Sequence, residues 1–163
     1  QYGWAFAFVA FGMIGTTQLN HVLLKRFNSE QLIKVALIHQ SIVGIVLLIG
    51  TWYNWYGMYS FTALIFLFVA AHGIMSPNTT ALSMAPFTKY AGSASALLGS
   101  FRLGVGAIVS ALVSILHNGT SIPMAAIMLI CAVTGLVLLN SGVAVVKYRA
   151  RKADARKEVA SLV

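Results

Sequence analysis

Charge is scarce in this sequence, because only 9% of its 163 residues are Asp, Glu, Lys or Arg. A soluble domain usually carries about a quarter charged residues, which keep its surface hydrated. Hydrophobic residues make up 59% of the chain, and folding alone cannot hide that much apolar surface from water. The composition therefore excludes an ordinary soluble domain and indicates a protein solvated by lipid.

Residues for catalysis are also lacking. The acids are Glu30, Asp154 and Glu158, and none lies inside an apolar run, so no carboxylate pair can act as general acid and base. The sequence has no Gly-rich phosphate loop, no HExxH motif and no Cys/His cluster with metal-ligand spacing. Its lone cysteine, Cys131, has no disulfide partner. We expect neither enzymatic activity nor a bound cofactor or metal.

Basic residues outnumber acidic ones, giving a net charge of +8. Such an excess can indicate nucleic-acid binding. Here, however, the cations lie at the ends of apolar runs or in the C-terminal tail, with Arg102 as the exception. This distribution is typical of a membrane protein, so we expect no nucleic-acid partner.

Five apolar runs each reach the roughly 20 residues that a membrane-spanning helix needs. Strands of a membrane barrel would alternate polar and apolar residues, and these runs do not. The sequence therefore predicts an all-α membrane protein, a bundle of five transmembrane helices. The expected spans are residues 2–24, 31–52, 60–86, 92–117 and 122–147, followed by a basic tail over residues 148–163.

The position of the cations predicts the topology. Cytoplasmic loops are enriched in Lys and Arg, and Lys25, Arg26, Lys34 and Lys89 fall on the same side as the tail. The N-terminus of this sequence should therefore lie outside and the C-terminus in the cytoplasm. The chain begins at Gln1 and enters an apolar run at once, so we expect it to be a piece of a longer chain.

Arg102 is the most unusual residue. It lies about ten residues into the fourth predicted span, hence roughly 15 Å deep, where a charge is costly and usually faces a bundle interior or a wet cavity. Small and polar residues recur beside it at helical spacing: Ser95, Gly99, Gly106 and Ser110. Arg102 is either a cavity or gating residue, or an arginine fixed to backbone carbonyls at a helix interface.

His72 is the second candidate, in the middle of the third span and shortly before Ser76, Pro77 and Asn78. Proline lacks an N–H and clashes with the preceding turn, so Pro77 should kink or break the helix. Interrupted helices at membrane depth often mark transporter sites. His72 either contacts substrate or relays protons, or it is a hydrogen-bonded packing residue.

Other polar residues in the spans favour packing roles. We interpret His39 and Gln40 as packing or interfacial residues. Gln18 and Asn20 are expected to clamp a neighbouring helix.

Three stretches carry a family resemblance: Ser76–Leu82, Ala85–Phe87 and Ala91–Ala107, with Asn20 and Lys25-Arg26-Phe27 in support. They resemble the Bcr/CflA drug-resistance transporters, in the drug:proton antiporter branch of the major facilitator superfamily. The resemblance implies the C-terminal half of that fold, helices eight to twelve of twelve. It places His72, Ser76, Pro77 and Asn78 in the span that lines the central cavity.

The resemblance also implies a seam of small residues against the other half of the transporter, formed by the span with Gly12 and Gly15 and by the span with Arg102. The acidic residue that couples protons belongs to the N-terminal half of such transporters. The proton gradient is thus implied by the resemblance alone.

The predicted function is proton-coupled efflux of drugs and other small molecules across the bacterial cytoplasmic (inner) membrane. The expected partners are the lipid bilayer, the missing N-terminal half and a small-molecule substrate. Two alternatives stay open, a proton-coupled transporter of a specific metabolite such as a sugar or nucleoside, and a non-transporting membrane scaffold subunit. A costly charge at the midplane favours transport over scaffolding.

Overall fold

The computed structural model describes residues 2–55 and 57–161 of the chain, and these residues contain helices and no strand. The elements are α1 (Tyr2–Leu23), α2 (Ser29–Trp52), α3 (Met58–Met84), the 3₁₀-helix η1 (Ala85–Tyr90), α4 (Ala91–Ile115) and α5 (Ile122–Ser161). The predicted all-α class is therefore confirmed.

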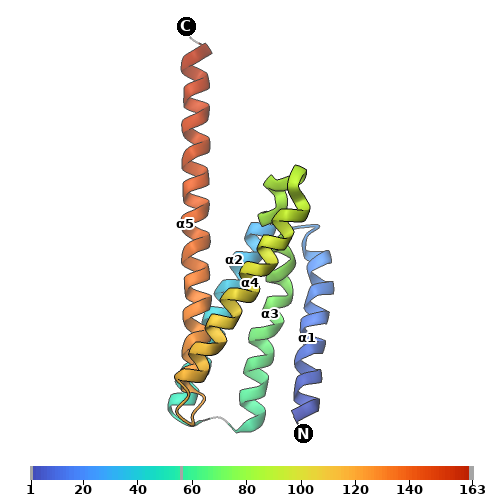
Figure 1. The fold of residues 1–163 in the computed structure, drawn as a ribbon, viewed down its shortest axis with the longest axis vertical. Coiled ribbons are helices and arrows are strands. Elements are labelled where there is room, and N and C mark those ends of the chain that lie inside the picture. Colours follow the sequence, from blue (N-terminus) through green and yellow to red (C-terminus); the bar gives the residue numbers. More distant parts are fainter. Residues whose placement is uncertain (1, 56, 162–163) are drawn as a thin grey trace.

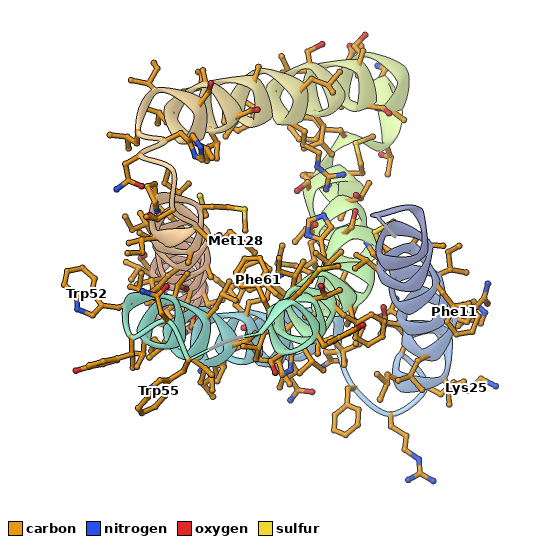
Figure 2. The ribbon with its side chains drawn as sticks, turned by 90° about the horizontal axis from the view of Figure 1, so that it is seen from below. Phe11, Lys25, Trp52, Trp55, Phe61 and Met128 are labelled. Carbon is orange, nitrogen blue, oxygen red and sulfur yellow. The ribbon has the colours of Figure 1, made fainter. Side chains whose placement is uncertain are left out.

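The helices run alternately up and down, so their connections gather at two ends (Figure 1). The α1–α2 loop, η1 and the C-terminal part of α5 lie at one end, and the α2–α3 and α4–α5 loops lie at the other. The cations of the loops and tail consequently share one end, as the topology prediction requires. The opposite end carries Trp52 and Trp55, whose side chains point away from the bundle (Figure 2).

Three helical segments of the described chain are long and apolar enough to cross a membrane. They are Ser29–Trp52, Ile122–Ala144 and the longer range Met58–Ile115, which comprises α3, η1 and α4. Apolar helices of this length agree with a membrane protein. The number of spans, and their correspondence to helices eight to twelve, remain predictions.

The packing centre is α2, which contacts both α3 and α5, while α1 contacts α3. Leu47 is completely buried, and Leu32, Ile33 and Leu37 are nearly so. Small residues allow α2 and α5 to approach closely. A Cβ atom on Gly135 would lie 3.1 Å from the Leu37 side chain, and Ala125 and Ala132 of α5 are buried as well.

In contrast, α4 stands apart from the other helices and has no buried residue. It is held mainly at its ends, by η1 and by the connection to α5 (Figures 1 and 2). Phe101, Leu103 and Ile115 are each more than two-thirds exposed. Apolar side chains in such numbers need a lipid or protein neighbour.

The helix break expected at Pro77 is not found there, because α3 is continuous through Pro77. The chain departs from helical geometry later, at Phe87 in η1, where φ is −108° and ψ is 35°. Pro86 at the start of η1 explains the position, since it cannot donate to the preceding turn.

The last helix extends beyond the predicted fifth span. α5 is continuous for 40 residues to Ser161, whereas the apolar run of the sequence gives way to a basic stretch at Lys147. The boundary that the sequence placed at residue 147 therefore falls inside one helix, and residues 148–161 continue it.

Candidate functional site

Arg102 bridges the two helices that otherwise barely touch. It projects from α4, and its Nη2 donates hydrogen bonds to Thr80 Oγ1 at 2.9 Å and Thr79 Oγ1 at 3.2 Å, both on α3. The sequence left open whether this arginine would bind backbone carbonyls. In the structure its hydrogen bonds go to hydroxyl groups instead.

The two threonines are suited to accept these hydrogen bonds. Thr79 Oγ1 donates its own proton toward Met75 O at 2.9 Å, and Thr80 Oγ1 donates to Ser76 O at 2.8 Å. Each hydroxyl has one donor proton and two acceptor lone pairs. Because the hydroxyl protons are directed to the α3 backbone, the oxygen lone pairs remain free to accept from the guanidinium. The direction of the hydrogen bonds between Arg102 and the two threonines is therefore fixed.

The acids of the sequence all lie at helix ends rather than in the apolar middle of a helix, where Arg102 is placed. Glu30, Asp154 and Glu158 are the acids of the whole sequence, and all lie outside the apolar runs. An ionised group in a low-dielectric setting costs several kcal/mol or more unless it is paired or hydrated. No acid in the described apolar segments therefore offsets this cost.

A cavity of about 560 Å³ opens beside this contact, between α2, α3 and α5. Its polar lining residues are Gln40, His72 and Thr79. The remaining lining residues are apolar or weakly polar: Ile33, Leu37, Phe68, Met75, Cys131, Ala132, Gly135, Leu138 and Leu139. Since Thr79 both lines the cavity and accepts from Arg102, the guanidinium is linked to the cavity rim. A mainly apolar cavity with a few polar groups is the usual form of a small-molecule site.

His72 and Gln40 have different surroundings in this cavity. His72 is exposed to it, lies about 10 Å along α3 from Thr79, and makes no hydrogen bond to any described residue. The hydrogen-bonded packing alternative for His72 thus has no partner in this part of the chain. Gln40 is buried and its Nε2 donates to Phe68 O at 3.1 Å, in agreement with a packing role.

Asn78, predicted as a cavity residue, lies in the interface between α1 and α3. Its side chain is only 1% exposed. Its Nδ2 donates to Asn20 Oδ1 at 2.6 Å and to Ile74 O at 2.7 Å. Asn20 is also buried, so the clamp expected of Asn20 is confirmed, with Asn78 as its partner. Gln18, expected to act in the same way, is exposed.

The same interface explains why α3 continues through Pro77. A proline at this position leaves the carbonyl of Gly73 without its normal helical donor. Thr17 Oγ1 of α1 lies 3.2 Å from Gly73 O and donates to it, sharing its proton with Met13 O at 2.8 Å. One turn away, Thr16 Oγ1 donates to Ala70 O at 2.6 Å.

The small residues predicted to form a seam fall into two groups. Gly12 is buried against the Phe66 ring of α3, which occupies the space of any Cβ atom there. In contrast, Gly15, Gly99 and Gly106 have no described neighbour within 4 Å of an added Cβ atom, and Ser95 and Ser110 are exposed. Ser76 and Pro77 are half-buried on α3. The seam role of the small residues and the cavity role of Ser76 and Pro77 stay predictions.

Four threonines were not recognised from the sequence as site residues: Thr16, Thr17, Thr79 and Thr80. Each doublet lies within an apolar run, where a hydroxyl must find a partner because water is absent. The position of Thr79 and Thr80 shortly after Pro77 was a further signal. What the sequence lacked was the pairing between helices.

Two curated proteins are similar to this chain. A bicyclomycin resistance protein homolog of Haemophilus influenzae is 28% identical over 137 residues, which cover 84% of this chain and 34% of that protein. An uncharacterised MFS-type transporter of Bacillus subtilis, YdgK, is 37% identical over 108 residues, covering 66% of this chain and 26% of its own length. The chain is related to bacterial membrane transporters.

This relationship confirms the resemblance drawn from the sequence motifs, and both matches lie in the C-terminal part of the relatives. The chain spans about a third or less of the length of these proteins. No protein-family model and no solved structure matches the chain. A membrane transporter is thus the class that the relatives support.

Proposed function

We propose that this chain is part of a secondary transporter that exports drugs or other small molecules in exchange for protons. The transporter relatives and the apolar helices support the general class. The printed name of the Haemophilus influenzae relative, which refers to bicyclomycin resistance, supports export of a drug. The observation that carries the proposal is the Arg102 guanidinium bound to Thr79 and Thr80 at the rim of the cavity.

The proposed mechanism uses the weak attachment of α4. Because α4 has no buried residue, it can shift against α3 without opening a packed interface. The hydrogen bonds from Arg102 to Thr79 and Thr80 hold α4 in the arrangement seen here. Their loss releases α4, so the guanidinium serves as a latch between two arrangements of the cavity wall, in the manner of the rocking halves of many transporters.

The event that would operate this latch is the replacement of the hydrogen bonds from Arg102 to the threonines by contacts of the guanidinium with substrate or water. Charge-assisted hydrogen bonds contribute about 1.5–3 kcal/mol each. Substrate or water that binds Arg102 more strongly in one arrangement of α4 by about 1.4 kcal/mol would shift the equilibrium roughly tenfold. We place the protein in the bacterial cytoplasmic membrane, with the basic end in the cytoplasm and the N-terminus of this sequence outside.

An efflux assay with the complete transporter tests the proposal. Cells expressing the Arg102→Ala variant should lose most export of fluorescent drug substrates, while Arg102→Lys should retain part of it because a cation remains. Lys89→Ala is the matched control, since Lys89 is a cation outside the helix packing and lies at the basic end.

The assay is run with and without a protonophore, at equal membrane expression of all variants. Wild-type export from the Arg102→Ala variant would refute the latch. Export that ignores the protonophore would refute proton coupling, and a complete transporter that moves only one metabolite would favour the metabolite alternative. A protein that transports nothing yet is needed to assemble another complex would favour the scaffold.

A further inference from the structure

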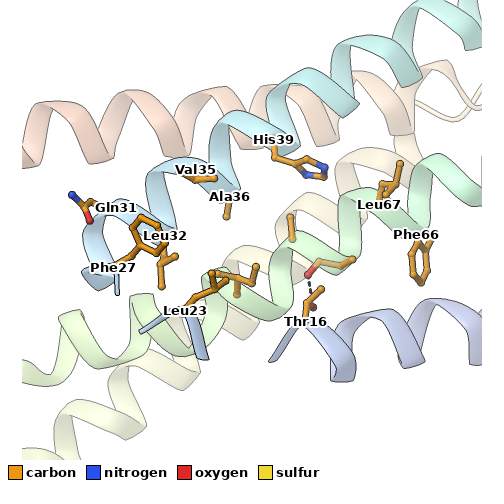
Figure 3. A pocket seen from close by; sticks show the side chains of 13 residues that line it. Thr16, Leu23, Phe27, Gln31, Leu32, Val35, Ala36, His39, Phe66 and Leu67 are labelled. Atoms are coloured by element: carbon orange, nitrogen blue, oxygen red, sulfur yellow. Dashed lines mark hydrogen bonds between the residues drawn. The ribbon is translucent and has the colours of Figure 1, made fainter. Parts of the chain in front are cut away.

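A second hollow lies on the other side of α3, between α1 and α2, and we call it the α1–α2 groove. Its volume is about 500 Å³. Both helices pack against α3, which forms the floor of the groove (Figure 3). The lining residues are Thr16, Leu23, Phe27, Gln31, Leu32, Val35, Ala36, His39, Phe66, Leu67, Ala70, Ala71 and Ile74. Ten of these thirteen side chains are apolar, the exceptions being Thr16, Gln31 and His39, so most of the groove suits a hydrocarbon occupant.

The length of the groove matches one leaflet of a bilayer. On α2 it extends from Gln31 to His39, and on α3 from Phe66 to Ile74, which is about 12 Å along each helix axis. The hydrocarbon core of a bilayer is about 30 Å thick, so one leaflet supplies about 15 Å. A single acyl chain aligned with the helices would therefore fill the groove from its entrance to its inner end.

Cations stand at the entrance. Leu23 and Phe27 both line the groove, and Lys25 and Arg26 are the exposed turn between them. This turn is tight, since Arg26 N and Phe27 N both donate to Leu23 O, at 3.0 and 2.9 Å. Lys34 lies one turn into α2, four residues after Glu30, the nearest acid in the sequence. The entrance thus carries an excess of positive charge at the headgroup level, next to an apolar channel.

We propose that the α1–α2 groove is a binding site for an anionic phospholipid, with one acyl chain in the groove and the phosphate at Lys25 and Arg26. An apolar channel one leaflet long would accept any phospholipid, and the cations at its entrance select the anionic headgroup. Cations near a membrane surface attract anionic lipid by about 1 kcal/mol each, which corresponds to about fivefold in affinity per cation. This proposal does not depend on what the protein transports.

The test places a fluorescent probe on the groove floor of the full-length protein. Leu67 is 44% exposed and lines the groove. Leu67→Trp is introduced after every tryptophan of the full-length protein, Trp4, Trp52 and Trp55 among them, has been replaced by Phe. The protein is reconstituted in phosphatidylcholine vesicles containing a small fraction of phosphatidylglycerol with brominated acyl chains, or of brominated phosphatidylcholine. Bromine quenches Trp fluorescence only at close range.

Quenching by the brominated anionic lipid should exceed quenching by the brominated neutral lipid. In the Lys25→Gln/Arg26→Gln variant, the affinity for the anionic lipid relative to the neutral lipid should fall roughly 25-fold. The Lys89→Gln variant and the charge-preserving Lys25→Arg/Arg26→Lys variant should keep the preference for the anionic lipid. A probe at Ile42, which is exposed on α2 outside the groove, should be quenched equally by both lipids.

Three results would overturn the proposal. Equal quenching by the two lipids at position 67 would mean ordinary contact with bulk lipid. Preference that survives in the Lys25→Gln/Arg26→Gln variant would mean that these cations do not hold the headgroup. Absence of quenching at position 67 would mean that protein covers the groove, from another part of the chain or a second copy. Transport is not measured in this experiment, so its outcome is separate from that of the Arg102 assay.

Discussion

The hydrogen bond between Asn20 and Asn78 offers the sharpest test of how α1 is fixed to α3. Both side chains are at least 96% buried, and the Nδ2 to Oδ1 distance is 2.6 Å. Replacing Asn78 by Leu removes the donor and leaves Asn20 Oδ1 buried without it. An unsatisfied buried polar atom costs about 1–3 kcal/mol in water-soluble proteins. In membrane proteins, cycles of single and double substitutions give interaction energies of about 0.6 kcal/mol on average and about 1.7 kcal/mol at most.

The experiment is a double-mutant cycle with Asn20→Leu, Asn78→Leu and the double variant. The free energy of unfolding is measured in mixed micelles by denaturant titration of the full-length protein. Because the bond is short and enclosed, we expect an interaction energy near the upper end of the membrane range, about 1–1.7 kcal/mol. The double variant should then lose less free energy of unfolding than the two single variants lose when their losses are added.

Additive effects within about 0.3 kcal/mol would refute this reasoning. They would show that each asparagine is satisfied independently, for example Asn78 by Ile74 O alone, which lies 2.7 Å from its Nδ2. Gln18→Leu is the control, because Gln18 lies on α1 close to Asn20 in sequence but is exposed. It should change stability little and show no interaction with Asn78→Leu.

Two further predictions concern the same helices. Gly73→Ala should lower the unfolding free energy by about 1–3 kcal/mol, because the added Cβ atom would lie 2.5 Å from Met13 O and would clash with Thr16 Oγ1. Gly142→Ala, which lies outside the predicted seam and has no described neighbour within 4 Å, should leave stability unchanged or slightly raised. Equal effects at both sites would contradict the close packing of α1 on α3. Thr80→Val should reduce efflux roughly tenfold at equal expression by removing an acceptor of Arg102, whereas Thr62→Val, which loses only a similar bond to its own helix, should not; equal losses in both variants would assign the effect to the α3 backbone.

Much of the fold followed from the length of the apolar runs. The second run was predicted as residues 31–52 and is observed as Ser29–Trp52, and the third was predicted as 60–86 and is observed as Met58–Met84. Helix ends agree this well because, in lipid, the backbone must bond within the helix until polar residues appear. The placement of the cations at one end followed from the same pattern.

The sequence could not supply the contacts between helices. Pro77 predicts a break when α3 is considered alone, and the Thr17 hydroxyl that helps to satisfy Gly73 O comes from a helix some 56 residues earlier. Asn78 looks like a cavity residue until Asn20 is placed against it. The sequence placed Arg102 near the middle of a helix, as α4 has it, but its partners Thr79 and Thr80 depend on how α4 crosses α3.

The continuity of α5 has a mechanical consequence. At about 1.5 Å per residue, its 40 residues measure about 60 Å, roughly twice the hydrocarbon thickness of a bilayer. The portion after residue 147, about 20 Å long, continues the same helix as the part that packs on α2. A tilt of α5 too small to detect inside the bilayer would be magnified at Ser161, where a spin label or fluorophore would report the motion of the whole bundle.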